Sequence, residues 1–356
     1  MTGRNAHPTL WIGTYPVLGQ GSLTGTGEGI WRASLDLGSG ALFDVRQVVA
    51  TPAPSYLAQG RNPDLLYAVN EDLDGYLTVL ALGGDGLTPL AQAATAGAHP
   101  CHLLVDERAG AVVVANYTSG SLAVFGLGPD GLPRQDRPDQ LFTLTGCGPH
   151  PERQASPHAH YVLPSPSGRH LLVTNLGGDR VHRFAIEPST GGLADAGIAV
   201  HLPAGSGPRH AVFSADGRRL YVAGELDGRL HIVEWDPERD EGRPVGSVAT
   251  HRWGPQVPQL AHVVRAGGEL HVGCRESNHI AVHPLQPDGT PDAARELRLP
   301  GNCPRHHAVV GDWLVVAQQE KGGVVVLDRQ GAVHGRADIP SPACVLPDAG
   351  NGRSTR

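Results

Sequence analysis

The chain has 356 residues, a formal net charge of −7 and 40 % hydrophobic residues, which is enough to bury a large core. Its 48 glycines and 30 prolines fall between short apolar runs, a composition that favours many short strands over long helices. No apolar run reaches the length of a membrane helix, and the mild acidity gives no reason to expect a nucleic-acid partner.

One short unit recurs along the chain: a proline, one or more polar residues and then an apolar run. Its seven copies begin at Pro54, Pro100, Pro157, Pro208, Pro258, Pro304 and Pro342. The intervals lie between 38 and 57 residues, close to the ~40–50 residues of a four-stranded propeller blade.

A second strand is predicted after each of the first six units. These strands are Leu65–Asn70, Val112–Tyr117, Leu171–Leu176, Leu220–Leu226, Leu270–Glu276 and Leu314–Glu320. Third strands with alternating polarity follow, among them Gly29–Leu35, Tyr76–Leu82, Ser121–Leu127 and Arg229–Trp235. The seventh unit has no following strand, whereas a matching strand, Trp11–Tyr15, stands unpaired at the start.

The numbers of units and strands agree with an all-β fold, a seven-bladed β-propeller whose C-terminal strand joins the N-terminal strands to complete blade seven. Closure removes the two open sheet edges that would otherwise recruit other chains. We expect one domain over residues 1–356, with a core of about 9–347 and disordered tails at 1–8 and 348–356. Two stacked sandwiches are the alternative, but they do not produce seven copies.

The five cysteines are widely spaced and form no CxxC pair, and the first residues lack the layout of a signal peptide. Free thiols and no leader predict a cytoplasmic protein. Monomer and dimer both remain open.

In a propeller blade the start of the inner strand and the end of the second strand meet at one mouth of the central channel. This places many polar residues together, which is the usual mark of a binding or active site. Inner-strand starts contribute His102, His158, His160, Arg209, His210, His262, Arg305 and His306, and second-strand ends contribute Glu71, Asn116, Asn175, Glu225 and Arg275. The alternative is a water-filled structural channel whose histidines bond the backbone between blades.

Several roles follow from side-chain chemistry. Arg209 and Arg275 offer planar charged forks for a carboxylate or phosphate. Glu225 acts either as a base towards water or as a counter-charge for an arginine, and His160 can share proton transfer. Arg153 lies in an insertion at about residues 133–156 that either folds over the mouth or is disordered.

A metal site is the competing use of these residues. Glu71, Asn116, Asn175 and Glu225 carry the oxygen ligands that calcium prefers. There is no HExxH motif and no compact His/Cys cluster. We therefore expect neither a metal nor a cofactor.

At these positions the sequence resembles the bacterial seven-bladed lactonase family, whose members include a 6-phosphogluconolactonase. The segments that carry the resemblance span nearly the whole chain: WIGTY (11–15), GIW (29–31), PSYLA (54–58), LLYAVNE (65–71), PCHLLVD (100–106), VVVANY with SGS (112–121), RQ..PHAH (153–160), NLGGDRV (175–181), GSGPRH (205–210), YVAGEL (221–226), PRH (304–306) and PACV (342–345). Two segments depart from the family, GCRESNH (273–279) and AQQEKGG (317–323).

The resemblance implies metal-free hydrolysis of a sugar lactone, most simply 6-phosphogluconolactone, with Arg275 or Arg305 holding the phosphate. Fungal muconate cycloisomerases are similar too, and their proposed catalytic residues would correspond to His160, Arg209, Glu225 and Arg275. Around this group we expect substrate contacts from Glu71, His102, Asn116, Arg153, His158, Asn175, His210, His262, Arg305 and His306. A muconate-type cycloisomerase and a non-enzymatic binding platform remain the alternatives, since this fold hosts many functions.

Overall fold

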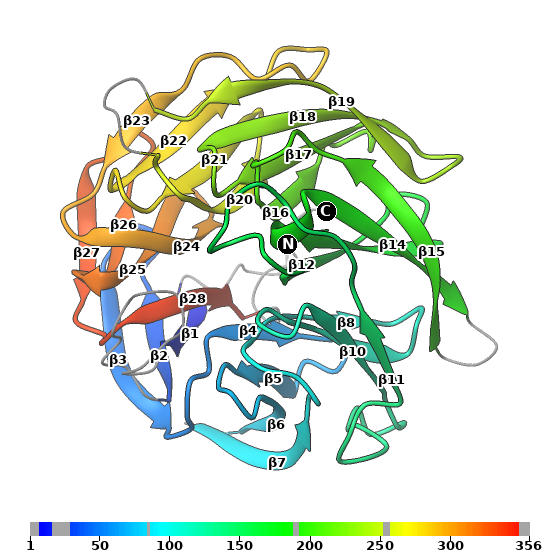
Figure 1. Ribbon diagram of the computed structural model, residues 1–356. Helices are drawn as coiled ribbons and strands as arrows, with labels where there is room; N and C mark the ends of the chain where they lie inside the picture. The colour runs from blue at the N-terminus through cyan, green and yellow to red at the C-terminus, as the bar shows by residue number, and fades with distance from the viewer. Residues whose placement is uncertain (1–6, 16–28, 84–85, 188–191, 252–256, 349–356) are drawn as a thin grey trace.

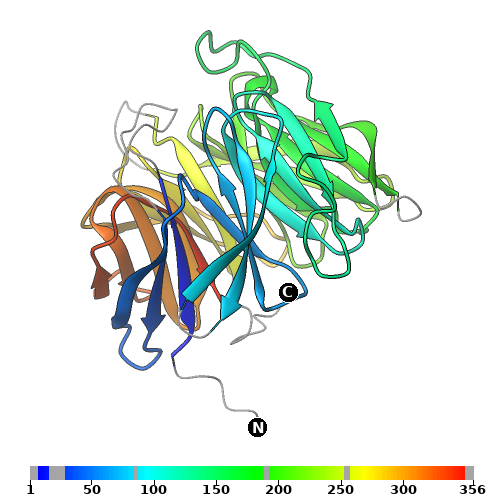
Figure 2. The same ribbon diagram turned by 90° about the horizontal axis from the view of Figure 1, so that it is seen from below.

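The computed structural model describes residues 7–15, 29–83, 86–187, 192–251 and 257–348. Over these residues, seven four-stranded antiparallel sheets stand around a central axis (Figure 1). The view turned by 90° shows the strands running across the thickness of the ring (Figure 2). The predicted all-β, seven-bladed propeller is confirmed.

Each blade consists of strands that follow one another in the chain, from the channel outwards. Blade one is β4 (Tyr56–Gln59), β5 (Leu65–Asn70), β6 (Tyr76–Gly83) and β7 (Gly86–Ala94); blade two is β8 (Pro100–Asp106), β9 (Ala111–Asn116), β10 (Ser121–Gly126) and β11 (Gln140–Thr143); blade three is β12 (Ala159–Pro164), β13 (His170–Asn175), β14 (Arg180–Glu187) and β15 (Gly192–His201). Blade four is β16 (Pro208–Phe213), β17 (Arg219–Gly224), β18 (Arg229–Asp236) and β19 (Glu241–Ala249); blade five is β20 (Leu260–Ala266), β21 (Glu269–Cys274), β22 (His279–Pro284) and β23 (Arg295–Arg298); blade six is β24 (Asn302–Val310), β25 (Trp313–Lys321), β26 (Gly323–Leu327) and β27 (Val333–Ala337).

Blade seven joins the two ends of the chain, as the repeat predicts. The inner strand β28 (Pro342–Pro347) pairs with β1 (Thr9–Thr14), which continues to β2 (Ile30–Leu35) and β3 (Leu42–Val49) (Figure 1). The register sets Ile12 opposite Val345 and Trp11 opposite Leu346. The N-terminal segment therefore supplies three strands that the C-terminal unit lacks.

Several second strands end one or two residues before the predicted limit, because the chain turns at the mouth. β13 stops at Asn175, and a single 3₁₀ turn, η1 (Leu176–Gly178), follows it. Within the described part of the chain, no helix is long and apolar enough to cross a membrane.

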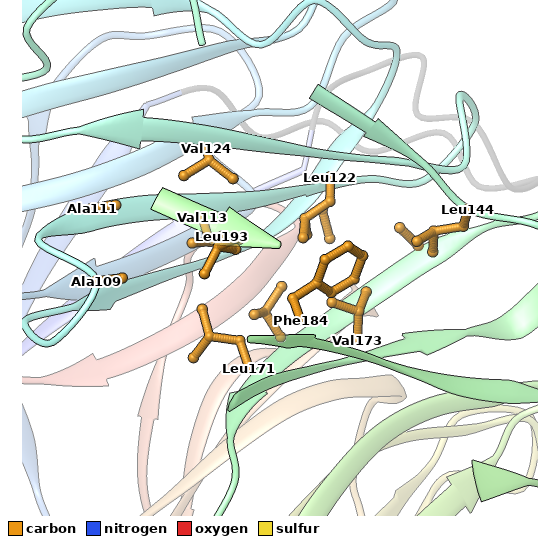
Figure 3. Packing of buried hydrophobic residues seen from close by; sticks show 13 residues of the cluster. Ala109, Ala111, Val113, Leu122, Val124, Leu144, Leu171, Val173, Phe184 and Leu193 are labelled. Carbon is orange, nitrogen blue, oxygen red and sulfur yellow. The ribbon is translucent and has the colours of Figure 1, made fainter. Parts of the chain in front are cut away.

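The core is divided among the seven interfaces between neighbouring blades. One hydrophobic cluster lies at each interface, from the cluster between blades one and two to the one that joins blades seven and one. Figure 3 shows the cluster between blades two and three, where Leu122 and Val124 face Val173 and Phe184. Middle strands such as Val112–Val114 are buried on both faces, which explains their continuous apolar runs.

Closure predicts that a short C-terminal truncation is severe. Removing residues 342–356 deletes β28, which exposes the edge of β1 and removes Cys344 and Val345 from the clusters on either side. We expect the free energy of unfolding to fall by about 5 kcal/mol or more, since each buried apolar side chain contributes ~1.5–3 kcal/mol. Urea unfolding measures this loss. Removal of residues 349–356 alone is the control, and equal midpoints for the two truncations would contradict closure as a source of stability.

Candidate active site

A bulge near the start of the inner strand brings two consecutive side chains to the channel. The pairing skips Cys101, His160, Arg209 and Arg305 in four blades, and similar shifts occur in β20 and β28. In a regular strand successive side chains point to opposite faces, whereas a bulge redirects one of them. Each of these four residues therefore lines the channel together with the residue that follows it.

The residues around the channel enclose a small cavity. The space that a water-sized sphere can occupy is about 30 Å³. All seven inner strands contribute to the lining, blade seven through Ala343 of β28, and Glu71 is added from the end of β5. Eight predicted site residues are among the lining: Glu71, His102, His160, Arg209, His210, His262, Arg305 and His306.

Six rings from six blades form a closed circle at one level of the channel, which we call the aromatic collar: Tyr56, His102, Tyr161, His210, His262 and His306. The ring centroids of neighbours lie between 3.6 and 5.8 Å apart. Burial is the main cause that lowers the pKa of all four collar histidines, to about 3 for His306. The collar is thus neutral at pH 7.

Beside the cavity, one buried carboxylate is enclosed by three arginines. Oε2 of Glu225 lies 2.9 Å from Nε of Arg209 and 2.9 Å from Nη2 of Arg275, and its Oε1 accepts a hydrogen bond of 2.6 Å from Arg153. The side chains of Glu225, Arg209 and Arg275 are at most 9 % exposed, whereas that of Arg153 is 32 % exposed. Arg153 is therefore the arginine that solvent reaches most easily.

The charges in this group set its protonation. Burial opposes ionisation of Glu225, but Arg275, Arg153 and Arg209 outweigh it and hold the pKa of the carboxyl well below its usual range. Burial, then Arg275 and Arg305, lower the pKa of Arg209 to about 10, so it stays charged at pH 7. Burial and then Arg209 lower the pKa of His160 well below its usual value, which leaves a neutral imidazole.

A second carboxylate lies on the other side of the mouth. Oε1 of Glu71 accepts a hydrogen bond of 2.6 Å from the hydroxyl of Tyr15, over whose ring the guanidinium of Arg305 lies at 4.4 Å. Arg305 also donates to Gln319. Oε2 of Glu71 is buried and has no hydrogen-bond partner among the described residues.

Arg153 reaches the mouth because its loop is anchored. The predicted insertion 133–156 contains β11, and the segment after it folds over the mouth. The buried Gln154 donates 2.7 Å to Oδ1 of Asp179 and 2.9 Å to the carbonyl of Leu176. Oδ1 of Asp179 also accepts from Gly207 N at 2.8 Å, two residues before Arg209. Asp179 therefore ties the Arg153 loop to the start of the Arg209 strand.

Four predicted substrate-binding residues lie outside the cavity lining: Asn116, His158, Asn175 and Arg153, the last of which contacts Glu225 instead. Asn116 and Asn175 are fully buried, and their amides bond the carbonyls of Thr95 and Thr145, so they hold the turns of the mouth. His158 stacks on the ring of Tyr117 at 4.5 Å, beside Arg153. The four residues of the calcium alternative do not converge, because these two asparagines serve the backbone and Glu225 is enclosed by arginines.

Five further residues of the site were not predicted from the sequence: Tyr15, Tyr56, Tyr117, Tyr161 and Asp179. Tyr56 stands two residues after its proline, the position that holds His102, His210 and His306 in other units. A comparison of the seven units by position would have found it. Asp179 has no counterpart among the units and gives no such signal.

Comparisons with known proteins identify the family of this fold. The model of the family described as "Lactonase, 7-bladed beta-propeller" matches residues 9–347. The chain belongs to this lactonase family. The 6-phosphogluconolactonase of Bacillus subtilis is 30 % identical over 352 residues, which cover 94 % of this chain and 97 % of that protein.

Solved structures of similar lactonases cover the same length. The periplasmic gluconolactonase of Pseudomonas aeruginosa superposes with a TM-score of 0.87 at 27 % identity, over 96 % of this chain and 99 % of the other. A putative 6-phosphogluconolactonase of Bacteroides uniformis gives 0.84 at 27 % identity, over 96 % and 100 % of the two chains. The resemblance to the lactonase family inferred from the sequence is confirmed.

The neutral collar predicts that this lactonase-family protein loses stability in mild acid. The unfolded chain binds protons below about pH 6.5 while the folded collar histidines do not, so stability falls by up to ~1.4 kcal/mol per pH unit for each of them. Urea unfolding between about pH 7.5 and 5.5 measures the slope, before carboxylates of usual pKa titrate. His262→Gln should reduce the slope of stability against pH by about 1.4 kcal/mol per pH unit, the contribution of one proton. A stability that is flat over this range would contradict neutral burial of the collar.

Asp179→Asn should loosen the two loops that this carboxylate joins, because an amide accepts fewer hydrogen bonds. We expect hydrogen exchange at Gly205 N and Gly207 N to accelerate by about tenfold, the equivalent of ~1.4 kcal/mol. Asp240→Asn is the matched control. Asp240 is also buried with a φ of 51°, but it joins Ser167 and His170 in blade three to the β18–β19 turn. Equal acceleration of hydrogen exchange at Gly205 N and Gly207 N in both variants would show that Asp179 does not specifically join the two loops.

Proposed function

We propose that the protein hydrolyses a phosphorylated sugar lactone, with 6-phosphogluconolactone as the first candidate and 6-phosphogluconate, of the pentose phosphate pathway, as the product. The observation that carries this proposal is the charge of the mouth. Four arginines (Arg153, Arg209, Arg275 and Arg305) face two glutamates (Glu71 and Glu225), a formal surplus of two positive charges. A phosphate monoester carries a negative charge of similar size and would neutralise this positive surplus.

The phosphate is assigned to Arg153 and Arg275. Arg153 is the most exposed of the three arginines around Glu225, and Arg275 approaches the same carboxylate from another blade. Arg305, the other candidate from the sequence, is engaged by Tyr15 and Gln319. A phosphate at Arg153 and Arg275 leaves Arg209, which lines the cavity, for the lactone.

The chemistry is assigned to His160 and Arg209. The three guanidinium groups around Glu225 favour its role as the counter-charge that orients them, and they make it a weak base. His160 is a neutral imidazole on the cavity wall, so its free ring nitrogen can accept a proton from water, although burial and Arg209 lower its pKa and make it a weaker base than an exposed histidine. Arg209 stabilises the oxyanion as water adds to the lactone carbonyl, a contribution of about 3–4 kcal/mol for a preorganised donor.

A cytoplasmic location belongs to the same proposal. All five cysteine thiols are free, which supports a reducing compartment. The muconate cycloisomerase and binding-platform alternatives gain no specific support from the mouth, and they are outcomes of the test.

The test is the hydrolysis of freshly generated 6-phosphogluconolactone, followed against its spontaneous rate. We expect acceleration by the wild-type protein that a chelator does not change. Arg153→Gln should raise KM about tenfold for this substrate, the loss of one charge-assisted contact of ~1.4 kcal/mol. The same variant should leave KM for unphosphorylated gluconolactone almost unchanged.

The remaining outcomes of the hydrolysis assay distinguish the alternatives. No acceleration over the spontaneous rate would reject the sugar lactone, and carboxymuconate would then be assayed. Acceleration that a chelator abolishes would show that a metal takes part. Equal effects of Arg153→Gln on both lactones would remove the phosphate from Arg153.

A further inference from the structure

The side chains that line the cavity inside the aromatic collar carry several buried polar atoms without a hydrogen-bond partner among the described residues. Among the described residues, Oε2 of Glu71, Oγ of Ser55, Nδ1 of His262 and both ring nitrogens of His210 are buried without a hydrogen-bond partner. All four side chains line this one cavity and are at most 6 % exposed. A buried polar atom without a partner costs about 1–3 kcal/mol, and a charged one costs more, so these atoms form a site for a small polar ligand.

The size of the cavity selects the ligand. A water molecule needs roughly 10–15 Å³ of such space. The cavity offers about 30 Å³, which suits one or two waters and is far too small for a sugar ring. A lactone bound to the arginines therefore stays at the mouth, with the cavity beneath it.

Glu71 is the carboxylate among the cavity-lining residues with unpartnered atoms. Its Oε1 is held by Tyr15 at 2.6 Å, and burial, then Glu71, raise the pKa of Tyr15 well above its usual value, so this hydroxyl remains a donor. Oε2 is left as an unpaired acceptor on a side chain that lines the cavity. Glu225, by contrast, does not line the cavity, and both of its oxygens contact arginines.

We propose that Glu71 is a catalytic residue that binds and orients the attacking water in this cavity, a role that rests on the proposed lactone hydrolysis. One O–H of the water donates to Oε2 of Glu71, and His160 takes the other proton as the water oxygen bonds to the lactone carbon. The carbonyl electron pair moves to its oxygen beside Arg209. Collapse breaks the ring C–O bond, the ring oxygen takes the proton from His160, and the new carboxylic acid loses its proton to solvent.

The test compares Glu71→Gln and Glu71→Ala with the wild-type protein on 6-phosphogluconolactone. The amide of Gln would present a donor to the water, so we expect kcat to fall by about 100-fold, with KM almost unchanged because the anion contacts remain. In Glu71→Ala, added formate should occupy the vacated volume and restore kcat by about tenfold in a saturable manner. Glu276→Gln, an exposed glutamate after β21, is the control and should keep wild-type kcat and KM.

Formate rescue separates catalysis from folding, because a purely structural loss does not respond to formate. A kcat of Glu71→Gln within about threefold of wild type would overturn the role of Glu71, since misplacement of the attacking water is expected to cost about 100-fold. A low kcat of Glu71→Ala that formate leaves unchanged would also overturn it. If Glu71→Ala does not fold, the isosteric Glu71→Gln decides alone. Absence of any wild-type acceleration would reject the proposed function itself, and the water site with it.

Discussion

The pairing of β28 with β1 is the contact on which the remaining structure depends, because no blade has a core of its own. Every hydrophobic cluster lies between two blades, so the last interface forms only when the ring closes. Closure also sets the width of the channel, since seven inner strands must stand around one axis. The channel is then narrow enough for side chains from six blades to touch across it, as the aromatic collar shows.

Within that ring, a local irregularity of the strands creates the site. Bulges let Arg209 and Arg305 face the channel together with the histidines that follow them, and regular strands would turn one member of each pair away. The consequence is a set of buried charges, which are costly unless they are paired. Glu225 offsets this cost for three arginines. One of them, Arg153, comes from a loop outside blade four, and Asp179 holds this loop in place.

The two carboxylates of the mouth differ in their surroundings, and the surroundings assign their chemistry. Glu225 contacts three guanidinium groups and behaves as a fixed negative charge. Glu71 has one oxygen held by Tyr15 and the other facing a cavity of water size. The mouth is therefore open and cationic and suits an anionic lactone, whereas the collar beneath it is closed and neutral.

Periodicity was enough to predict the seven blades, the closure through Pro342–Pro347 and the gathering of His160, Arg209 and Glu225 at one mouth, because each repeat carries the same order of strands. The same reasoning placed Asn116 and Asn175 among the substrate contacts, although they bond the backbone of the turns. It also overlooked Tyr161, because the unit at Pro157 has two more residues before its collar position than the unit at Pro100. The number of arginines that contact a glutamate depends on partners 16 to 72 residues away in the chain. Two of the three partners of Glu225, Arg153 and Arg275, lie outside its own blade, and such contacts are properties of the folded ring that no local pattern encodes.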